Sequence, residues 1–316
     1  MKYCDIKGFN YQPSYGTSGL ELWMKFHAET IKLELGRGKR HFPWMNTVRL
    51  WLSWDAYQRD EKRFVANFET ALAIADFYGL KVMPVLFNRW HTNSIDYGGV
   101  YIDHFLPGSR NNVQRLFEPY MEDIVGGHAN DARISAWDLC NEPLFYRNSE
   151  IPQVVVDAEI KWLEYLYSDC KRLKAEAPVT VCPMRHFDEL MHLSDFLSCH
   201  PYYNLGDAKE DFERALDSLV EKAAKAQKSL VATETCWGSY DDAERAEIIR
   251  YTLGELNKRK IGWLAYVLHN SGVADAHAKD EGAFSNAGNL AFIAANGELR
   301  PGHQVVNEFG SSVRED

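Results

Sequence analysis

The chain has 316 residues, 46 % of them hydrophobic, which is enough for the core of one large α/β domain. The net charge of −10 argues against a nucleic-acid partner, because binding phosphates requires a basic surface. The sequence contains no apolar run of about 18 residues that could cross a membrane. The opening MKYCDIKGFN lacks the apolar core of a signal peptide, so we expect a cytoplasmic protein. The oligomeric state is left open.

Short apolar runs alternate with amphipathic stretches along the whole chain. The predicted strands span 6–11, 47–54, 81–88, 133–142, 178–184, 195–203, 229–237 and 261–269. The stretches with apolar residues at helical spacing are 19–36, 63–79, 111–128, 154–177, 208–227 and 241–259. Strand and helix repeated about eight times, with nearly continuous apolar strands, is the pattern of a parallel (β/α)8 TIM barrel. We predict that residues 1–316 form a single barrel domain.

The active face of such a barrel is built by the loops that follow the strands. The longest irregular segments, 88–110 and 269–289, follow the third and eighth predicted strands. We expect these two segments to contribute walls of the substrate site.

Polar side chains gather at the predicted carboxyl ends of four strands. They are Arg49 on the second strand, Asn141 and Glu142 on the fourth, His200 and Tyr202 on the sixth, and Glu234 on the seventh. Glu142 and Glu234 therefore meet across the barrel. Glycoside hydrolysis needs such a pair, because one carboxyl protonates the leaving oxygen while the other attacks the sugar or activates water. Arg49 and Tyr202 are suitable neighbours for an ionised nucleophile.

The stretch WDLCNEP (137–143), followed by TETCWG (233–238), resembles the retaining β-glycosidases of glycoside hydrolase clan A. Family 5, the cellulase and mannanase family, is the most similar. GFNYQPS (8–14), NTVRLWLSW (46–54) and CHPYY (199–203) resemble its first, second and sixth strands. The resemblance implies that Glu142 is the acid/base, Glu234 the nucleophile, Asn141 the amide that binds the sugar 2-hydroxyl, and Arg49 the cation beside the nucleophile. It implies no cofactor and no metal.

Two positions depart from the family pattern. Family 5 members usually end strand three with a histidine, and here Asn88 or His91 is left for that place. They also usually carry a tryptophan near the end of strand eight that forms the floor of the sugar site. Here Tyr266 or His269 stands instead.

Other residues near the strand ends have two interpretations. Aromatic side chains there either stack on sugar faces or belong to the core: Trp54, Trp90, Tyr97, Tyr101 and Trp237. Asp138 is interpreted as a buried hydrogen-bonding support and not as a catalyst. The six cysteines occur singly, without a CxxC pair, and are expected to be reduced thiols.

The predicted function is a retaining glycoside hydrolase that cleaves β-glycosidic bonds in oligosaccharides or glycosides, so the expected partner is a carbohydrate substrate. One alternative is a metal-dependent barrel hydrolase built on His91, His200, Glu234 and the acidic loop after strand eight. Strand one offers no HxH pair, which disfavours it. The other alternative is a barrel that binds glycans without cutting them. The intact glutamate pair argues against that reading.

Overall fold

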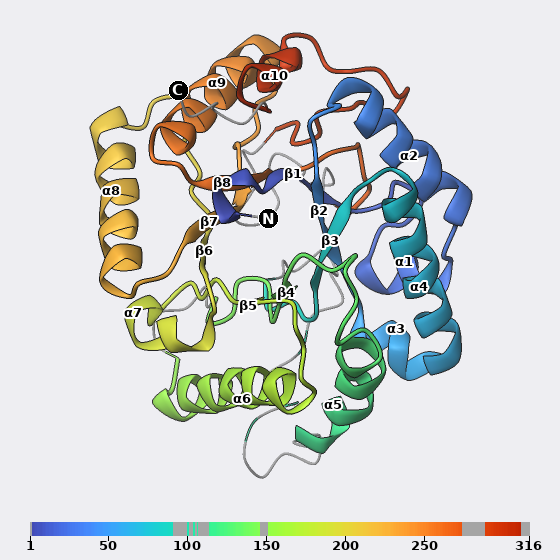
Figure 1. The fold of residues 1–316 in the computed structure, drawn as a ribbon. Helices are drawn as coiled ribbons and strands as arrows, with labels where there is room; N and C mark the ends of the chain where they lie inside the picture. The colour runs from blue at the N-terminus through green and yellow to red at the C-terminus, as the bar shows by residue number, and fades with distance from the viewer. Residues whose placement is uncertain are drawn as a thin grey trace.

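The computed structural model describes residues 2–90, 100, 104, 106, 114–145, 151–273 and 288–310. In this part of the chain, eight parallel strands form one sheet in the order β5-β4-β3-β2-β1-β8-β7-β6. They are β1 (Lys7–Tyr11), β2 (Thr47–Trp51), β3 (Lys81–Val85), β4 (Trp137–Asp138), β5 (Val179–Thr180), β6 (Leu197–Cys199), β7 (Leu230–Thr235) and β8 (Gly262–Ala265). Figure 1 shows the strands enclosed by a ring of helices, and the predicted (β/α)8 barrel is confirmed.

The barrel closes at two seams. β1 pairs with both β2 and β8, so the first and last strands lie side by side. Between β5 and β6 the contact is made by single bonds: the Asp195 N–H donates to the Val179 carbonyl at 2.7 Å. The Thr180 hydroxyl donates to the Phe196 carbonyl at 2.8 Å and lies 3.0 Å from the Ser198 hydroxyl oxygen.

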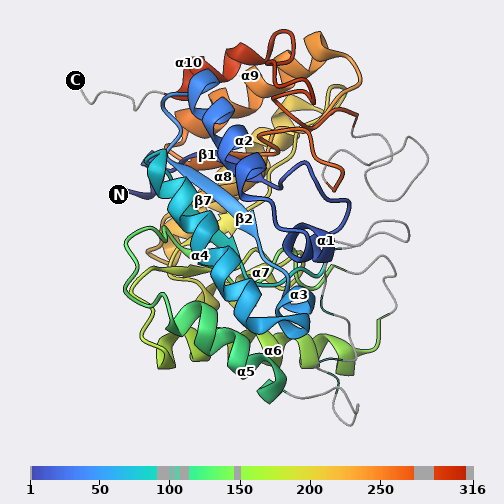
Figure 2. The same cartoon turned by 90° about the vertical axis from the view of Figure 1, so that its right-hand side faces the viewer.

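The helices cover the outside of the barrel, and Figure 2 shows α2 and α4 packed along its length. The α-helices are α1 (Gly19–Met24), α2 (Ala28–His41), α3 (Trp54–Arg59), α4 (Glu61–Phe77), α5 (Gln114–Met121), α6 (Gln153–Arg172), α7 (Phe187–Leu190), α8 (Lys209–Lys225), α9 (Asp242–Lys258) and α10 (Asn307–Gly310). A π-helical turn, Glu122–Gly126, extends α5, and 3-10 turns occur at Tyr3–Asp5, Met191–Leu193 and His303–Val306. None of the helices in the described ranges is long and apolar enough to span a membrane.

The predicted boundaries differ from the observed ones where side chains cap helices. The predicted helix 19–36 is divided into α1 and α2, because the His27 side chain accepts the Thr30 N–H and starts a new helix. The predicted strand 47–54 is shortened because Ser53 accepts the Ala56 N–H and begins α3. The predicted strand 133–142 is interrupted, with β4 flanked by single bridges that join Ile134 to Val82 and Asn141 to Asn88.

A small apolar cluster packs inside the barrel. Its members come from six different segments: Ile6, Met83, Ala136, Phe196, Val231 and Leu264. Met83 pairs with Arg49 in the parallel ladder between β2 and β3, and paired residues of adjacent strands share a face of the sheet. The barrel interior is therefore a packed core that supports the polar side chains at the carboxyl ends of the strands.

Candidate active site

Arg49 lies at the centre of the polar side chains and is fully buried. Its Nε donates to Asp138 Oδ2 at 2.9 Å, and its Nη2 donates to Asn141 Oδ1 at 2.9 Å. Its Nη1 donates to Glu234 Oε1 at 2.5 Å and to Asn10 Oδ1 at 2.8 Å. Burial alone would lower the pKa of Arg49, but the charges of Asp138 and Glu234 raise it above its usual value. One guanidinium group thus connects the ends of strands one, two, four and seven.

Both carboxylate oxygens of Glu234 accept hydrogen bonds. Oε1 receives the Arg49 guanidinium, and Oε2 receives the Tyr202 hydroxyl at 2.8 Å. Burial, and then the charges of Glu234 and Glu142, raise the pKa of Tyr202 well above its usual value, so its hydroxyl keeps its proton and donates. Glu234 is held by two donors of different charge and has little freedom to rotate.

Glu142 lies in a turn with unusual backbone geometry. Its φ is +45° and that of Leu144 is +60°, a left-handed conformation that costs a side-chain-bearing residue about 1–3 kcal/mol. The Leu144 N–H donates to Glu159 Oε1 at 2.8 Å, and Arg89 Nε donates to the same oxygen at 3.0 Å. Glu159 on α6 and Arg89 in the loop after β3 form a buried ion pair. This pair holds the turn that directs Glu142 into the barrel.

His200 lies between the two glutamates. Its Nδ1 is 2.8 Å from Glu142 Oε1 and 3.6 Å from Glu234 Oε2. Burial lowers the pKa of His200, but the charge of Glu234 and the hydrogen bond to Glu142 raise it overall. Its Nε2 is buried and forms no hydrogen bond with the residues that the structure describes.

One ligand atom each from Glu142, His200 and Glu234 lies within 4.8 Å of the other two. The ligand atom of each glutamate is a carboxylate oxygen, so an oxygen of Glu142 lies within 4.8 Å of an oxygen of Glu234. Three such groups are suitable in type for a metal ion. However, the Arg49 charge, 2.5 Å from Glu234, opposes a second cation there. The arrangement suits proton transfer and nucleophilic attack better than metal binding.

Asn88, one of the two candidates at the end of strand three, belongs to the hydrogen-bond network around Arg49. Its Oδ1 accepts from Asn141 Nδ2 at 3.0 Å, while Asn141 Oδ1 faces Arg49. His91, the other candidate, lies outside the described residues. Trp90 is buried, and its ring centre is 6.2 Å from that of Phe145, so this ring packs in the interior.

Tyr266 and His269, the two candidates at the end of strand eight, have different neighbours in the structure. Tyr266 directly follows β8 and is one of the groups that raise the pKa of Tyr202, after burial, Glu234 and Glu142. The Tyr266–Val267 peptide bond is cis. His269 lies instead 3.5 Å from Glu34 and 3.1 Å from Arg37. Tyr266 is therefore the strand-eight side chain near the glutamate pair.

Of the aromatic side chains, Trp237 and Trp54 have different surroundings. Trp237 is half-buried, and its ring meets that of Tyr202 edge-on with 5.0 Å between centres. Trp54 is buried against Phe117 and belongs to the core. Tyr97 and Tyr101 lie outside the described residues.

Three buried residues in contact with these groups were not singled out from the sequence: Asn10, Arg89 and Glu159. Asn10 on β1 pairs with Arg49 in the ladder and donates to the Thr233 carbonyl at 2.9 Å. Glu159 lies within the apolar face of α6, between Val156 and Trp162. A carboxylate at an apolar position of a helix is a signal that could have identified it.

No family model matches the chain, and a search of curated proteins finds no match. Solved structures do match. GH5_18 from Streptomyces cattleya, in complex with GlcNAc, aligns with a TM-score of 0.74 at 14 % identity over 95 % of this chain and 78 % of that one. An exo-β-1,4-mannosidase from Opitutaceae bacterium strain TAV5 aligns with a TM-score of 0.73 at 17 % identity, over 96 % of this chain and 58 % of that one.

A third match is a glycoside hydrolase family 5 mannosidase from Rhizomucor miehei, with a TM-score of 0.66 at 14 % identity. This alignment covers 96 % of this chain and 92 % of that one. The resemblance that the motifs indicate is therefore confirmed at the level of the fold, and the chain is a (β/α)8 barrel similar to the glycoside hydrolases of family 5.

Proposed function

We propose that the chain is a retaining glycoside hydrolase that cleaves β-glycosidic bonds in oligosaccharides or glycosides. The observation that carries the proposal is the pair of buried glutamates, Glu142 and Glu234, whose nearest oxygens lie within 4.8 Å. Retaining enzymes have carboxyl groups about 5–5.5 Å apart, whereas inverting enzymes leave room for a water at about 6.5–9.5 Å. An oxygen-to-oxygen distance of 4.8 Å or less is compatible with the retaining separation, and we infer direct attack by one carboxylate.

In the first step, a Glu234 oxygen attacks the anomeric carbon while the bond from that carbon to the leaving oxygen breaks. Glu142 donates its proton to the leaving oxygen, and the alcohol departs. The ion pair with Arg49 and the Tyr202 hydrogen bond fit Glu234 for the anionic role. The product of this step is a glycosyl ester on Glu234 and an ionised Glu142.

In the second step, Glu142 takes a proton from a water molecule, whose oxygen attacks the same anomeric carbon. The bond to Glu234 breaks, and the free sugar leaves with its original anomeric configuration. His200, 2.8 Å from Glu142, keeps that carboxyl in place in both steps. The Asn141 amide, held between Arg49 and Asn88, is the proposed partner of the sugar 2-hydroxyl.

β-Mannosides are the first substrates to test. Two of the similar structures are described as mannosidases, and a variant of the Streptomyces cattleya protein is described in complex with Manβ1-4GlcNAc. These descriptions support a β-mannoside or a related β-glycoside as the carbohydrate substrate of this chain.

The test is hydrolysis of a panel of 4-nitrophenyl β-glycosides, with mannose, glucose, galactose, xylose and N-acetylglucosamine as the sugar. We expect turnover of at least one member, unchanged by EDTA, and a loss of about a thousandfold or more in Glu142→Gln and Glu234→Gln. Glu69→Gln, which changes a half-exposed carboxylate on α4, is the matched control and should keep full activity. Activity that survives both active-site substitutions, or that EDTA abolishes, would refute the proposal.

A further inference from the structure

A cavity of about 450 Å³ opens between the loops that follow β6 and β7. This volume is within the range of about 300–1,000 Å³ that is typical of ligand pockets. The lining residues used in the argument below are Asn204, Leu205, Trp237, Tyr240, Asp241 and Glu244. Because these loops follow strands, the cavity is at the same end of the barrel as the glutamate pair.

Trp237 connects the cavity to the candidate active site. It lines the cavity, and its ring is 5.0 Å from the Tyr202 ring. The Tyr202 hydroxyl in turn lies 2.8 Å from Glu234 Oε2. A series of contacts therefore runs from Glu234 through Tyr202 and Trp237 to the cavity.

The lining has the groups that bind a sugar ring. The Tyr240 side chain is 57 % exposed and Leu205 is 41 % exposed, so both offer apolar surface to a pyranose face. The side-chain amide of Asn204 and the hydroxyl of Tyr240 form no hydrogen bond with other residues in the described part of the chain. They are open to hydroxyl groups of a ligand.

The charged groups of the cavity are acidic. Asp241 Oδ1 accepts the N–H groups of Ala243 and Glu244 at the start of α9, and Glu244 Oε2 accepts from the Ser239 hydroxyl. Within the described ranges, Asp241 Oδ2 and Glu244 Oε1 accept no hydrogen bond, so both oxygens can accept from sugar hydroxyls. None of the described residues that line the cavity is basic. The carboxylates of Asp241 and Glu244 repel anionic groups, so a uronic acid or a sulfated sugar is disfavoured.

Gly288 and Asn289 contact the backbone beside Tyr240 and hold it in place. The Asn289 N–H donates to the Ser239 carbonyl at 3.0 Å. Gly288 has a φ of +67°, and a Cβ there would lie 2.3 Å from the Ser239 carbonyl carbon. The contact requires glycine and holds the Tyr240 backbone in place before any ligand binds.

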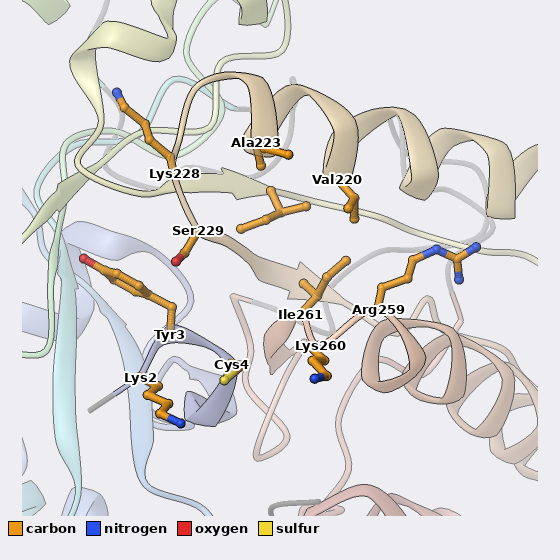
Figure 3. Close-up of a pocket in the computed structure, with 12 residues that line it drawn as sticks. Lys2, Tyr3, Cys4, Val220, Ala223, Lys228, Ser229, Arg259, Lys260 and Ile261 are labelled. Carbon is orange, nitrogen blue, oxygen red and sulfur yellow. The ribbon is translucent and has the colours of Figure 1, made fainter. Parts of the chain in front are cut away.

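Figure 3 shows a second cavity, of about 550 Å³, at the end of the barrel opposite the glutamate pair. It lies at the amino ends of β7 and β8, beside Tyr3 and Ile261. The charged ends of Lys228 and Arg259 point away from each other in Figure 3 and are bound to other groups. Neither Glu142 nor Glu234 is among the described residues that line it.

We propose that the cavity between the β6 and β7 loops is a second sugar subsite, which binds a neutral pyranose ring of the substrate cleaved at Glu142 and Glu234. This proposal rests on the proposed function, because it assigns the ligand of the cavity as a distal part of the same oligosaccharide.

The test compares two substrates in the same variants: 4-nitrophenyl β-mannoside and β-1,4-mannotriose, or the corresponding glucosides if the panel selects glucose. Tyr240→Ala should lower kcat/KM for the trisaccharide about tenfold relative to the aryl glycoside, from lost stacking. Tyr240→Phe, which keeps the ring, should recover most of that ratio. Phe77→Ala removes an aromatic side chain that is 71 % exposed on α4, and should leave the ratio at the wild-type value.

An unchanged ratio in Tyr240→Ala, with wild type active on both substrates, overturns the subsite and leaves the proposed function intact. If wild type hydrolyses no member of the 4-nitrophenyl β-glycoside panel, the proposed function fails. Calorimetric titration of mannotriose into wild type and Tyr240→Ala then decides the subsite separately. Weaker binding by the variant supports the subsite, whereas equal binding or none overturns it.

Discussion

Glu159 Oε1 accepts the backbone N–H of Leu144 at 2.8 Å, two residues after Glu142. The same oxygen receives Arg89 Nε at 3.0 Å, and both charged side chains are buried. A carboxylate on α6 therefore fixes the left-handed turn that presents the proposed acid/base.

We expect Glu159→Ala to lower kcat more than tenfold while KM changes little, because the turn that aims Glu142 loses its acceptor. Glu159→Gln keeps an oxygen that can accept the Leu144 N–H, so it should retain about ten times the activity of the alanine variant. Rates are measured per folded molecule, and thermal unfolding is recorded for each variant. If both variants unfold more easily yet keep wild-type kcat, Glu159 only stabilises the fold.

The Arg49 cluster predicts a large stability cost for a conservative substitution. Lysine cannot reproduce the planar fork that bonds Asp138, Glu234 and Asn141, so Arg49→Lys should lower the free energy of unfolding by about 3–5 kcal/mol. Arg133→Lys is the matched control, because Arg133 also binds carboxylates in two directions but is 24 % exposed. It should cost less than about 1 kcal/mol. Urea denaturation of both variants tests this, and equal losses would contradict it.

His200 should give a pH-dependent contribution to stability. Its pKa is raised in the folded state above the unfolded value of about 6.5. The stabilisation is therefore fully present below about pH 6.5, and it is lost as the pH rises through the folded pKa. Against His200→Asn, the wild-type Tm advantage should be largest near pH 6 and shrink towards pH 9. An advantage that grows with rising pH would show that the shift has the opposite sign.

Glu142 as general acid predicts a dependence on the leaving group. Glu142→Ala should lose about a hundredfold to ten-thousandfold in kcat/KM for sugar leaving groups, which need a proton. For 2,4-dinitrophenyl glycosides, which leave without one, formation of the glycosyl enzyme should change only a few-fold. Added azide should restore turnover as a β-glycosyl azide. The same loss for both leaving groups would assign Glu142 a different role.

The strand-end residues could be predicted because parallel strands bring their carboxyl ends to one face. The structure brings together four of these residues, Arg49, Glu142, His200 and Glu234, as the alternating pattern predicts. Arg49 and Glu234 are in contact although they are 185 residues apart in the sequence. Asn10 also belongs to this group, although it was not singled out. The sequence does not indicate which group the Asn10 side chain binds. Its position beside Arg49 follows from the pairing of β1 with β2.

The helix-borne groups were harder to find because most helix carboxylates face solvent. Glu159 on α6 and Glu34 on α2 both fall at apolar positions of their helices, Glu34 between Ile31 and Leu35. Their partners, Arg89 and His269, come from distant loops, and side-chain pairing over such separations is decided by packing. Strand lengths were overestimated for a related reason. Apolar runs such as 133–142 remain buried beyond the residues that hydrogen-bond in the ladder.

The most direct test of the central claim, nucleophilic attack by Glu234, is intact-protein mass spectrometry with a 2-deoxy-2-fluoro β-glycoside that carries a good leaving group. Wild type and Glu234→Gln are each incubated with the compound of the sugar that the panel identifies. We predict a stable increase equal to one fluoroglycosyl group on wild type alone, mapped by peptide digestion to Glu234. An adduct on another residue, or an adduct of the same mass on Glu234→Gln, would contradict the mechanism.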